Sequence, residues 1–591
     1  MTDFHKKSIQ SLLSEKRLAE AFAELRQTAQ TLQNWQLNNR LDELEESYKY
    51  MIRYVADGCN DPQREEIHNG ITAKLMELAD ITEQELTVQN SPKLYYETLR
   101  MERKYPRSLE ALLESYRECA DKTALFYELP ADKRDSDQER TLLMEKEKAA
   151  NAVFKHIWVT FPVTADEAGT LDKLFADADA TAEIKELAMA ATMLSLLEHY
   201  SEHLLLSLLD LYAANAFNDA SLSMKALCCA LIAMHCHRET IKHSSAISLR
   251  IANIADSERG RRDIMTVFLQ FIRSRSTERI SQKVRDELVP KLMKLSPEMR
   301  RKMRDGFSDD IEEMAKNPDW QEMLNESGIT DKMQELSRMQ AEGSDVFLSS
   351  FARLKSFPFF NDVANWFVPF TPRHSSIFRV FAGNSGSMLL SMVDRTGAFC
   401  DSDKFSFALS VATMPDQHRS MMMAQFDEQQ EQVINEMAGS LPNPDKQREN
   451  IANKYVQSLY RFFNLFRSRN DFYNPFSTRL NLIDVPFVSD ALSDTKSLRL
   501  IAEFYFSMQC YTDALSTFGK VLKQDSPTAS DYQKTGYCHE QLKQYVLATA
   551  DYEKVELLKP NDVWTLKHLA LCYRAVNDTE KAIANYKRAE T

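Results

Sequence analysis

The strongest constraint on the fold is a pattern that recurs at a constant interval near the carboxyl end of the chain. Small residues recur in this way at Ala514, Ala548 and Ala582, and aromatic residues at Phe518, Tyr552 and Tyr586. A second set keeps the same register at Ala502, Gly536 and Ala570, followed three positions later by Tyr505, His539 and Tyr573. Such an interval, about 34 residues, is typical of stacked helical hairpins, in which small residues lie where two helices touch. The pattern predicts an α-solenoid.

The same pattern resembles the tetratricopeptide (TPR) family, with three repeats between residues 495 and 591. The resemblance implies pairs of antiparallel helices, with the first helix of each pair lining a concave groove that receives an extended peptide or a helix. The positions that correspond to the family's groove are Lys496, Arg499, Glu503, Phe506, Ser530, Gln533, Tyr537, Glu540, Trp564, Lys567, Leu571 and Arg574. The alternative for each of these side chains is a contact with a neighbouring helix.

Chaperone-binding TPR proteins hold the carboxylate of a C-terminal tail with Lys, Arg and Asn at five positions. The corresponding positions here are Arg499, Glu503, Lys534, Trp564 and His568. Only Arg499 suits a carboxylate and Glu503 would repel one, so tail binding of that kind is not expected. The last repeat lacks a polar capping helix, so either the natural chain continues past Thr591 or this edge docks on another surface, for example by self-association.

Composition favours helices in the rest of the chain as well. Only 13 of 591 residues are glycine and 25 are methionine, so long helices joined by short turns are expected. The predicted fold class is therefore all-α, an α-solenoid of HEAT-like or irregular helical hairpins with a C-terminal TPR array. The HEAT resemblance rests on two stretches, one beginning at Glu186 and the other at Met224, which align with each other position by position.

Five segments are expected along the chain. Among the helical hairpins of the first segment, Ser108 is predicted to cap a helix over 109–127. The segments are residues 1–150 (N-terminal hairpins), 151–295 (HEAT-like repeats), 296–345 (charged and Met-rich helices), 346–490 (an aromatic-rich irregular region) and 491–591 (the TPR array).

Charge reverses sharply in the middle of the chain. Residues 259–304 hold fourteen Lys or Arg against five Asp or Glu, a net of +9, and residues 305–345 hold three against twelve, a net of −9. Mutual pairing of the two blocks or a plain solvated surface is expected, with an acidic protein partner or nucleic acid as the alternatives. Methionines at helical spacing in this region predict packing between irregular helices, with a groove for apolar partner helices as the alternative: Met299, Met303, Met314, Met323, Met333 and Met339.

Two aromatic- and proline-rich stretches, residues 351–381 and 459–487, interrupt the helical pattern. Prolines at this density exclude continuous helix. We expect connections that bury their rings against the solenoid, with a partner site or a membrane surface as the alternatives. Helices are expected again at about 417–437 and 446–466.

No sequence motif for catalysis is present, so a non-enzymatic protein without a cofactor is expected. The segment around Ser385 resembles a serine-protease loop, but the sequence lacks the strands that would position such a serine, so a catalytic role is not expected. The best metal candidate is His199 with His203, expected one turn apart on a helix, near a group in the next repeat: Cys228, Cys229, His235, Cys236, His237 and His243. Because these cysteines occupy small-residue positions of the two aligned stretches, packing is the preferred interpretation.

The predicted function is that of a protein-interaction scaffold or adaptor with a protein or peptide partner. The alternatives are a regulatory subunit of an enzyme or of a chaperone-like complex and, less favoured, a metal-dependent enzyme or a nucleic-acid binder. Nine scattered cysteines without a CxxC pair and no long apolar run predict a cytoplasmic protein with no membrane partner. The net charge of −14 opposes general polyanion binding.

Overall fold

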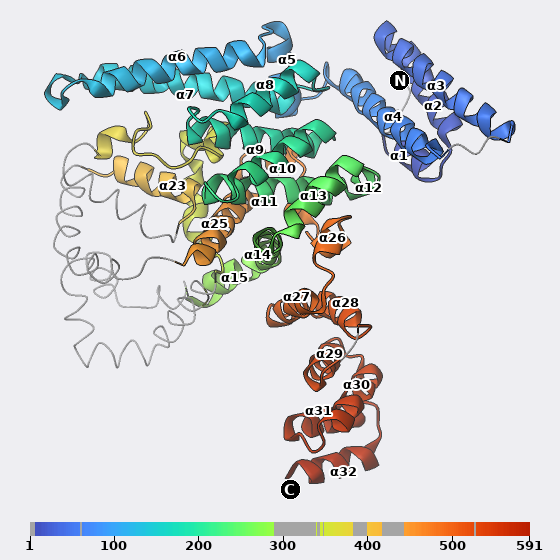
Figure 1. Ribbon diagram of the computed structural model, residues 1–591. Helices are drawn as coiled ribbons and strands as arrows, with labels where there is room; N and C mark the ends of the chain where they lie inside the picture. Colours follow the sequence, from blue (N-terminus) through green and yellow to red (C-terminus); the bar gives the residue numbers. More distant parts are fainter. Residues whose placement is uncertain are drawn as a thin grey trace. The chain divides into compact units, whose positions relative to one another are not determined.

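The computed structural model describes residues 6–58, 62–288, 339, 343–346, 348–381, 399–415, 443–524 and 527–590. In these ranges the chain forms α-helices, short 3-10 helices and one π-helical turn, and none of them contains a β-strand (Figure 1). The predicted all-α class is confirmed. None of the helices in these ranges is long and apolar enough to cross a membrane.

The chain divides into two compact units, and the second is discontinuous in sequence. Unit 1 comprises Met1–Arg250 and Ser281–Arg479, and unit 2 comprises Ile251–Ile280 and Leu480–Thr591. A segment from the middle of the chain therefore belongs with the C-terminal residues. The five-segment division made from the sequence stays a prediction.

Several sequence predictions fall outside the described residues. These are the methionines from Met299 to Met333, Ser385, the helix expected at 417–437, residues 289–304 of the positive block and most of the negative block.

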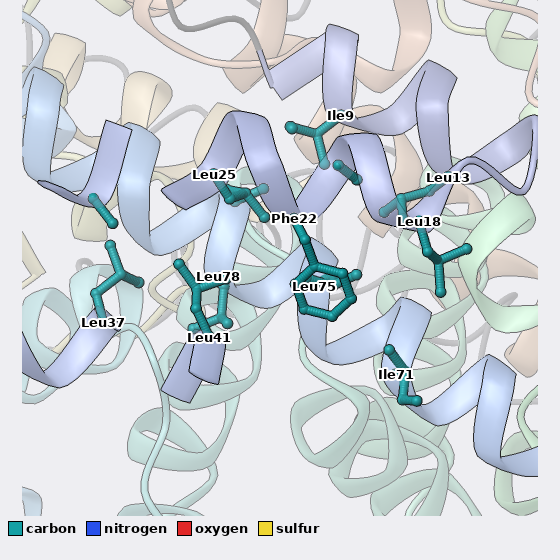
Figure 2. Close-up of a cluster of buried hydrophobic side chains, with 13 residues drawn as sticks. Ile9, Leu13, Leu18, Phe22, Leu25, Leu37, Leu41, Ile71, Leu75 and Leu78 are labelled. Atoms are coloured by element: carbon teal, nitrogen blue, oxygen red, sulfur yellow. The ribbon is translucent and has the colours of Figure 1, made fainter. Parts of the chain in front are cut away.

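Unit 1 begins with four helices around one apolar cluster. Helices α1 (Lys6–Ser14), α2 (Leu18–Leu32), α3 (Trp35–Ala56) and α4 (Arg64–Thr87) each contribute residues to it. Figure 2 shows Phe22 of α2 beside Leu75 of α4, with Leu25 and Leu78 further along the same two helices. The apolar stripe of each helix is buried while the charged positions between the stripes stay exposed.

The turn between α1 and α2 has a left-handed residue, Lys16, at φ 60°, and the Arg17 amide donates to the Leu12 carbonyl at 2.8 Å. This combination closes the end of a helix and reverses the chain. It recurs three times in unit 2, at the equally spaced residues Gln509, Lys543 and Asn577. The first hairpin of the chain therefore has the turn of the C-terminal hairpins, a likeness that the sequence pattern did not reveal.

The next helices are α5 (Leu94–Lys104), α6 (Leu109–Glu128), the 3-10 turn η1 (Ala131–Lys133) and α7 (Ser136–Val159). The predicted cap is confirmed, because the Ser108 hydroxyl accepts from the Ala111 amide at 3.3 Å. Helices α6 and α7 pack along each other as a long hairpin (Figure 1).

Helices α8 to α13 follow, and α9 and α11 contain the two stretches that align in the sequence. Their bounds are α8 (Ala165–Ala176), α9 (Ala182–Glu198), α10 (Glu202–Asn215), α11 (Ala220–Cys236), α12 (Arg238–Ile241) and α13 (Ser245–Asp256). Cys228 and Cys229 are fully buried in α11, and burial raises the pKa of both thiols. Their burial agrees with the predicted packing role.

The aromatic stretches form short turns that bury their rings, as expected for the described part. The short elements are α21 (Leu348–Ala352), η3 (Arg353–Ser356), η4 (Pro358–Asn361), η5 (Ala364–Trp366) and η6 (Phe378–Phe381) in the first stretch, and η7 (Arg469–Asp471) and η8 (Pro475–Ser477) in the second. Two longer helices, α23 (Asp401–Ala412) and α25 (Pro444–Leu465), lie between them, and α25 extends into the second stretch. Trp366 and Phe462 are 2% and 0% exposed, with ring centroids 5.8 Å apart. Phe472 stacks on Trp158 of α7 at 5.4 Å, which attaches the second stretch to the helical layer.

A buried ionic network joins four distant parts of unit 1. The Arg461 guanidinium of α25 lies 2.8 Å from a carboxylate oxygen of Asp345 and 2.8 Å from one of Asp403. The Lys355 ammonium lies 3.0 Å from the other oxygen of Asp403. All four side chains are at most 3% exposed, so two cations and two carboxylates neutralise each other away from water.

A second polar contact holds three helices together. His156 of α7 lies between two carboxylates, with Nδ1 3.4 Å from Glu102 of α5 and Nε2 3.1 Å from Glu167 of α8. Burial by itself would lower the pKa of this imidazole, but the two carboxylates together raise it to about 9.

Unit 2 begins in the middle of the chain with the end of α13, helix α14 (Glu258–Ser274) and the start of α15 (Thr277–Lys283), which continues as the π-turn η2 (Val284–Leu288) into unit 1. Gly260 is required at the turn into α14, because a Cβ atom there would lie 1.9 Å from the Ile254 carbonyl oxygen. Short elements η9 (Leu482–Asp484) and α26 (Val488–Ala491) then lead to six helices: α27 (Thr495–Ser507), α28 (Tyr511–Val521), α29 (Ala529–Gln541), α30 (Tyr545–Leu558), α31 (Val563–Ala575) and α32 (Thr579–Glu590).

Helix α14 covers the first helix of this C-terminal array. Phe268 is fully buried, and its ring meets Tyr505 of α27 edge to face at 6.3 Å. Arg275 donates to the Asp513 carboxylate at 2.8 Å and Arg279 to the Gln509 side chain at 2.9 Å. Part of the positive block of residues 259–304 therefore serves to attach this segment to α27 and α28.

We expect Phe268→Ala to destabilise unit 2 by about 3 kcal/mol or more, because it opens a cavity between α14 and α27. Hydrogen exchange of the full-length protein should accelerate first in α14 and α27. Phe217→Ala is the matched control, since Phe217 is 73% exposed and its removal leaves no cavity. Equal protection of α27 in both variants would contradict this role of α14.

His156 makes stability depend on pH in a defined window. Its pKa rises from about 6.5 in an unfolded chain to about 9, so its contribution is complete below pH 6.5 and disappears as the pH rises through 9. The contribution is about 1.4 kcal/mol for each pH unit between the two pKa values. We expect the difference in thermal unfolding between wild type and His156→Gln to shrink from pH 6 to pH 9.5. The exposed His203→Gln is the control, and a difference that stays constant with pH would refute the assignment.

Candidate partner-binding surface

The C-terminal array of helices α27 to α32 consists of three hairpins in one register. The first helices begin at residues 495, 529 and 563, and the second helices at 511, 545 and 579, so both series advance by the same interval. The amide of the first residue after each left-handed turn residue donates back into the preceding helix: Cys510 to Tyr505, Gln544 to His539 and Asp578 to Tyr573. The three hairpins predicted from the sequence are present. Their membership of the TPR family stays a prediction.

Small residues allow the two helices of a hairpin to approach closely. At Gly536 in α29, a Cβ atom would lie 2.8 Å from Cε1 and 2.9 Å from Cδ1 of the fully buried Tyr552 ring of α30. The ring therefore lies directly against the backbone of α29. Its position decides where its hydroxyl group points.

The Tyr552 hydroxyl donates to the Glu540 carboxylate at 2.9 Å, and burial together with this carboxylate raises the pKa of Tyr552. The same Glu540 oxygen is 2.8 Å from Nδ1 of His568 in α31. The His568 ring in turn lies 3.8 Å from the Trp564 ring, centroid to centroid, with the two planes 30° apart. A continuous series of contacts thus leads from the core of the second hairpin to an indole that is 40% exposed.

Trp564 belongs to a strip of aromatic side chains that crosses the three first helices. Tyr537 of α29 lies between Phe506 of α27, at 5.5 Å, and Trp564 of α31, at 5.9 Å, measured between ring centroids. Tyr511, at the start of α28, closes the strip beside Phe506 and Tyr537 at 6.2 and 6.1 Å. We call these four residues, Phe506, Tyr511, Tyr537 and Trp564, the aromatic strip; each is partly exposed.

Other predicted groove residues hold neighbouring hairpins together. Arg499 makes two hydrogen bonds, each 2.9 Å long, to the carboxylate of Asp531, and the Lys534 ammonium lies 2.5 Å from Glu503. Burial by itself would raise the pKa of Asp531, but Arg499 and Thr528 hold it below its usual range. Gln533 donates to Asp562 and Thr565, both at 3.1 Å.

The remaining predicted positions lie on exposed or partly exposed parts of the first helices. They are Lys496 on α27, Ser530 on α29, and Lys567, Leu571 and Arg574 on α31. Trp564, Lys567, Leu571 and Arg574 follow one another at helical spacing, so they share one face of α31. The predicted set therefore divides into residues that link the hairpins and residues available to a partner.

The five carboxylate-clamp positions are occupied by internal contacts. Arg499 binds Asp531, Glu503 binds Lys534, and Trp564 stacks on His568. The structure adds a reason to the sequence argument against a carboxylate clamp, because the one suitable side chain, Arg499, already has a partner.

Sequence reasoning did not identify Tyr511, Tyr552 or His568 as determinants of this surface. The repeat pattern identifies Tyr552 only as one of its recurring aromatic residues, and His568 only as a clamp position. The signal that was available is the glycine at position 536, where the other two repeats carry alanine. A smaller residue at that position indicates that a neighbouring ring comes closer than in the other hairpins.

The metal candidate predicted from the sequence is partly wrong. His199 and His203 do not share a helix, because α9 ends at Glu198 and α10 begins at Glu202. His199 is buried, 3.7 Å from a carboxylate oxygen of Asp80 and stacked on Phe161 at 4.3 Å, whereas His203 is exposed. Among the described residues no three His, Cys, Asp or Glu side chains are grouped as metal ligands.

Comparison with known proteins identifies a distant relative. The chain is 31% identical over 100 residues to the uncharacterized protein ycf37 of Guillardia theta. The match covers 16% of this chain and 56% of that protein, so the chain spans little more than half the length of the relative. No protein-family model matches the chain, and no solved structure matches it.

We expect Gly536→Ala to disturb the surface through the core. The added methyl group must displace the Tyr552 ring, which costs about 1–3 kcal/mol and outweighs the roughly 1 kcal/mol gained in helix propensity. Loss of the Tyr552 to Glu540 contact should change the environment of Trp564, measured by its fluorescence in a variant that lacks the other tryptophans.

Gly519→Ala is the matched control, because it lies in α28 and a Cβ atom there meets nothing within 4 Å. That variant should gain stability and leave the Trp564 signal unchanged. The two glycine variants behaving alike would show that Tyr552 does not constrain residue 536.

Proposed function

We propose that the protein is a non-enzymatic scaffold or adaptor that binds a peptide or helix of a partner protein along the first helices of a TPR array. The observation that carries this proposal is the aromatic strip, whose partly exposed rings contact one another and, at Tyr537 and Trp564, the His568 ring. Aromatic side chains that are both exposed and immobilised are typical of residues that dominate protein interfaces.

Two features support the family assignment within this proposal. The starts of the helices and the left-handed turn residues both recur at one constant interval. That interval matches the period of TPR hairpins, about 34 residues. The small residues at the hairpin contacts, Ala502, Gly536 and Ala570, are buried as the repeat requires.

The proposal includes a cytoplasmic location and no catalytic role. None of the eight cysteines among the described residues forms a disulfide, and free cysteines suit a reducing compartment. The buried charges of unit 1 that were described above neutralise each other, since Arg461 and Lys355 together balance two carboxylates, Asp345 and Asp403. Such internal pairing supports a structural role for these groups.

The regulatory-subunit alternative uses the same surface, and the identity of the partner separates it from a scaffold. Self-association through α31 and α32 also stays a prediction, with Ile583 of α32 51% exposed on this hairpin.

The test is quantitative co-purification from cells that naturally produce the protein. With the double variant Trp564→Ala/Leu571→Ala, the amount of each specific partner protein that co-purifies should fall at least about tenfold relative to wild type. The reason is that truncating the anchor residues of an interface costs about 2 kcal/mol or more of binding free energy. The control, Lys520→Ala, changes an exposed residue of α28 outside the first helices. Partners retained equally by wild type and the double variant would show that the array surface does not bind them.

A further inference from the structure

We propose that the array surface selects an acidic segment that carries a large apolar side chain. This inference rests on the proposed function, because it specifies the chemistry of the partner that the same surface binds. Three observations lead to it: the internal pairing of every carboxylate along the first helices, three cations without such pairing, and an exposed indole on the same face of α31 as two of these cations.

Helix α31 contains no carboxylate, and the carboxylates of α27 and α29 all have internal partners. Glu503 pairs with Lys534, and Asp531 accepts from Arg499 and from Thr528. Glu540 accepts from Tyr552 and contacts His568. The negative charge of these helices is therefore already balanced by neighbouring groups, and little of it is available to attract a basic partner.

Three cations on α27 and α31 have no internal partner among the described residues. Lys496, Lys567 and Arg574 are exposed, and in the described part of the chain none of their side chains has a hydrogen bond or ion pair. The excess field along the first helices is thus positive, on a chain whose net charge is −14. An acidic segment complements this field, and a basic one is repelled by it.

Helix α31 combines charge and apolar contact on one face. Lys567 and Arg574 lie on either side of Leu571, with Trp564 one turn before Lys567. The contact with His568, 3.8 Å between ring centroids, restrains the indole before any partner arrives. Binding to an aromatic side chain that is already restrained costs less conformational entropy. This face therefore suits a partner segment whose large apolar side chain contacts the indole and whose carboxylates contact the two cations.

A single-stranded nucleic acid also uses aromatic and cationic groups, and the charge count argues against it. Residues 480–591 carry fifteen Asp or Glu and thirteen Lys or Arg, so the segment that contains the surface is itself slightly negative. Three cations do not form the continuous positive groove that follows a phosphate backbone. Acidic peptide is therefore the assigned occupant.

The experiment measures fluorescence anisotropy with the full-length protein and three short labelled peptides of equal length. The first alternates Glu with Ser around a central Trp-Leu pair, the second has Lys in place of every Glu, and the third has Ala-Ala in place of Trp-Leu. The first should bind at least about tenfold more tightly than either of the others. Its affinity should fall with added salt, because the charge contacts are solvent-exposed.

Charge reversal supplies the matched variants. Lys567→Glu/Arg574→Glu should weaken the first peptide at least about tenfold, whereas Lys520→Glu/Lys523→Glu changes the net charge equally on an exposed part of unit 2 and should have little effect. Equal losses in both double variants would mean that only net charge matters and would overturn the inference. So would tighter binding of an oligothymidylate than of the acidic peptide.

The outcomes separate this inference from the proposed function. Binding of the Lys peptide at least as tightly as the Glu peptide, lost with Trp564→Ala/Leu571→Ala, would leave the array as a peptide-binding surface and refute its acidic preference. No binding of the Glu peptide would refute the inference as well, while the co-purification experiment decides the proposed function independently.

Discussion

The candidate surface depends on one close contact in the core of the second hairpin, that between Gly536 and the Tyr552 ring. A hydrogen atom in place of a side chain lets the ring lie against the backbone of α29, with no room for a Cβ atom. From that position its hydroxyl reaches Glu540, which reaches His568, which supports Trp564. Packing in the interior thereby restricts the orientation of an exposed indole, whose ring also lies 5.9 Å from that of Tyr537 and 6.0 Å from that of Tyr552.

In both units, the paired charged side chains connect different parts of the same unit. In unit 1, Arg461 joins Asp345 and Asp403 from distant parts of the sequence, and removing one member would leave a buried charge without compensation. In unit 2, Arg499 and Lys534 connect successive first helices. The groups that lack such internal partners are therefore more informative about binding than the total charge of the chain.

Local signals in the sequence were sufficient where a local cause operates. The cap at Ser108, the helix that follows it and the three C-terminal hairpins were predicted because capping and the repeat spacing act within a few turns of the residues concerned. His199 and His203 were placed on one helix incorrectly, since periodicity alone did not show that α9 ends at Glu198 and that a new helix begins at Glu202. The covering role of α14 was missed because Phe268 and Tyr505 lie far apart in the sequence, where no local pattern connects them.

The sequence by itself determined the helical class, the register of the array and the set of positions that face along its first helices. Only the tertiary structure decided which of those side chains are used between hairpins, as Arg499 and Glu503 are, and which remain exposed, as Lys567 and Arg574 do. The physical reason is that spacing along a helix establishes the face on which a residue lies. Whether a charge on that face finds a partner depends on the neighbouring helix, whose position results from packing of the whole hairpin.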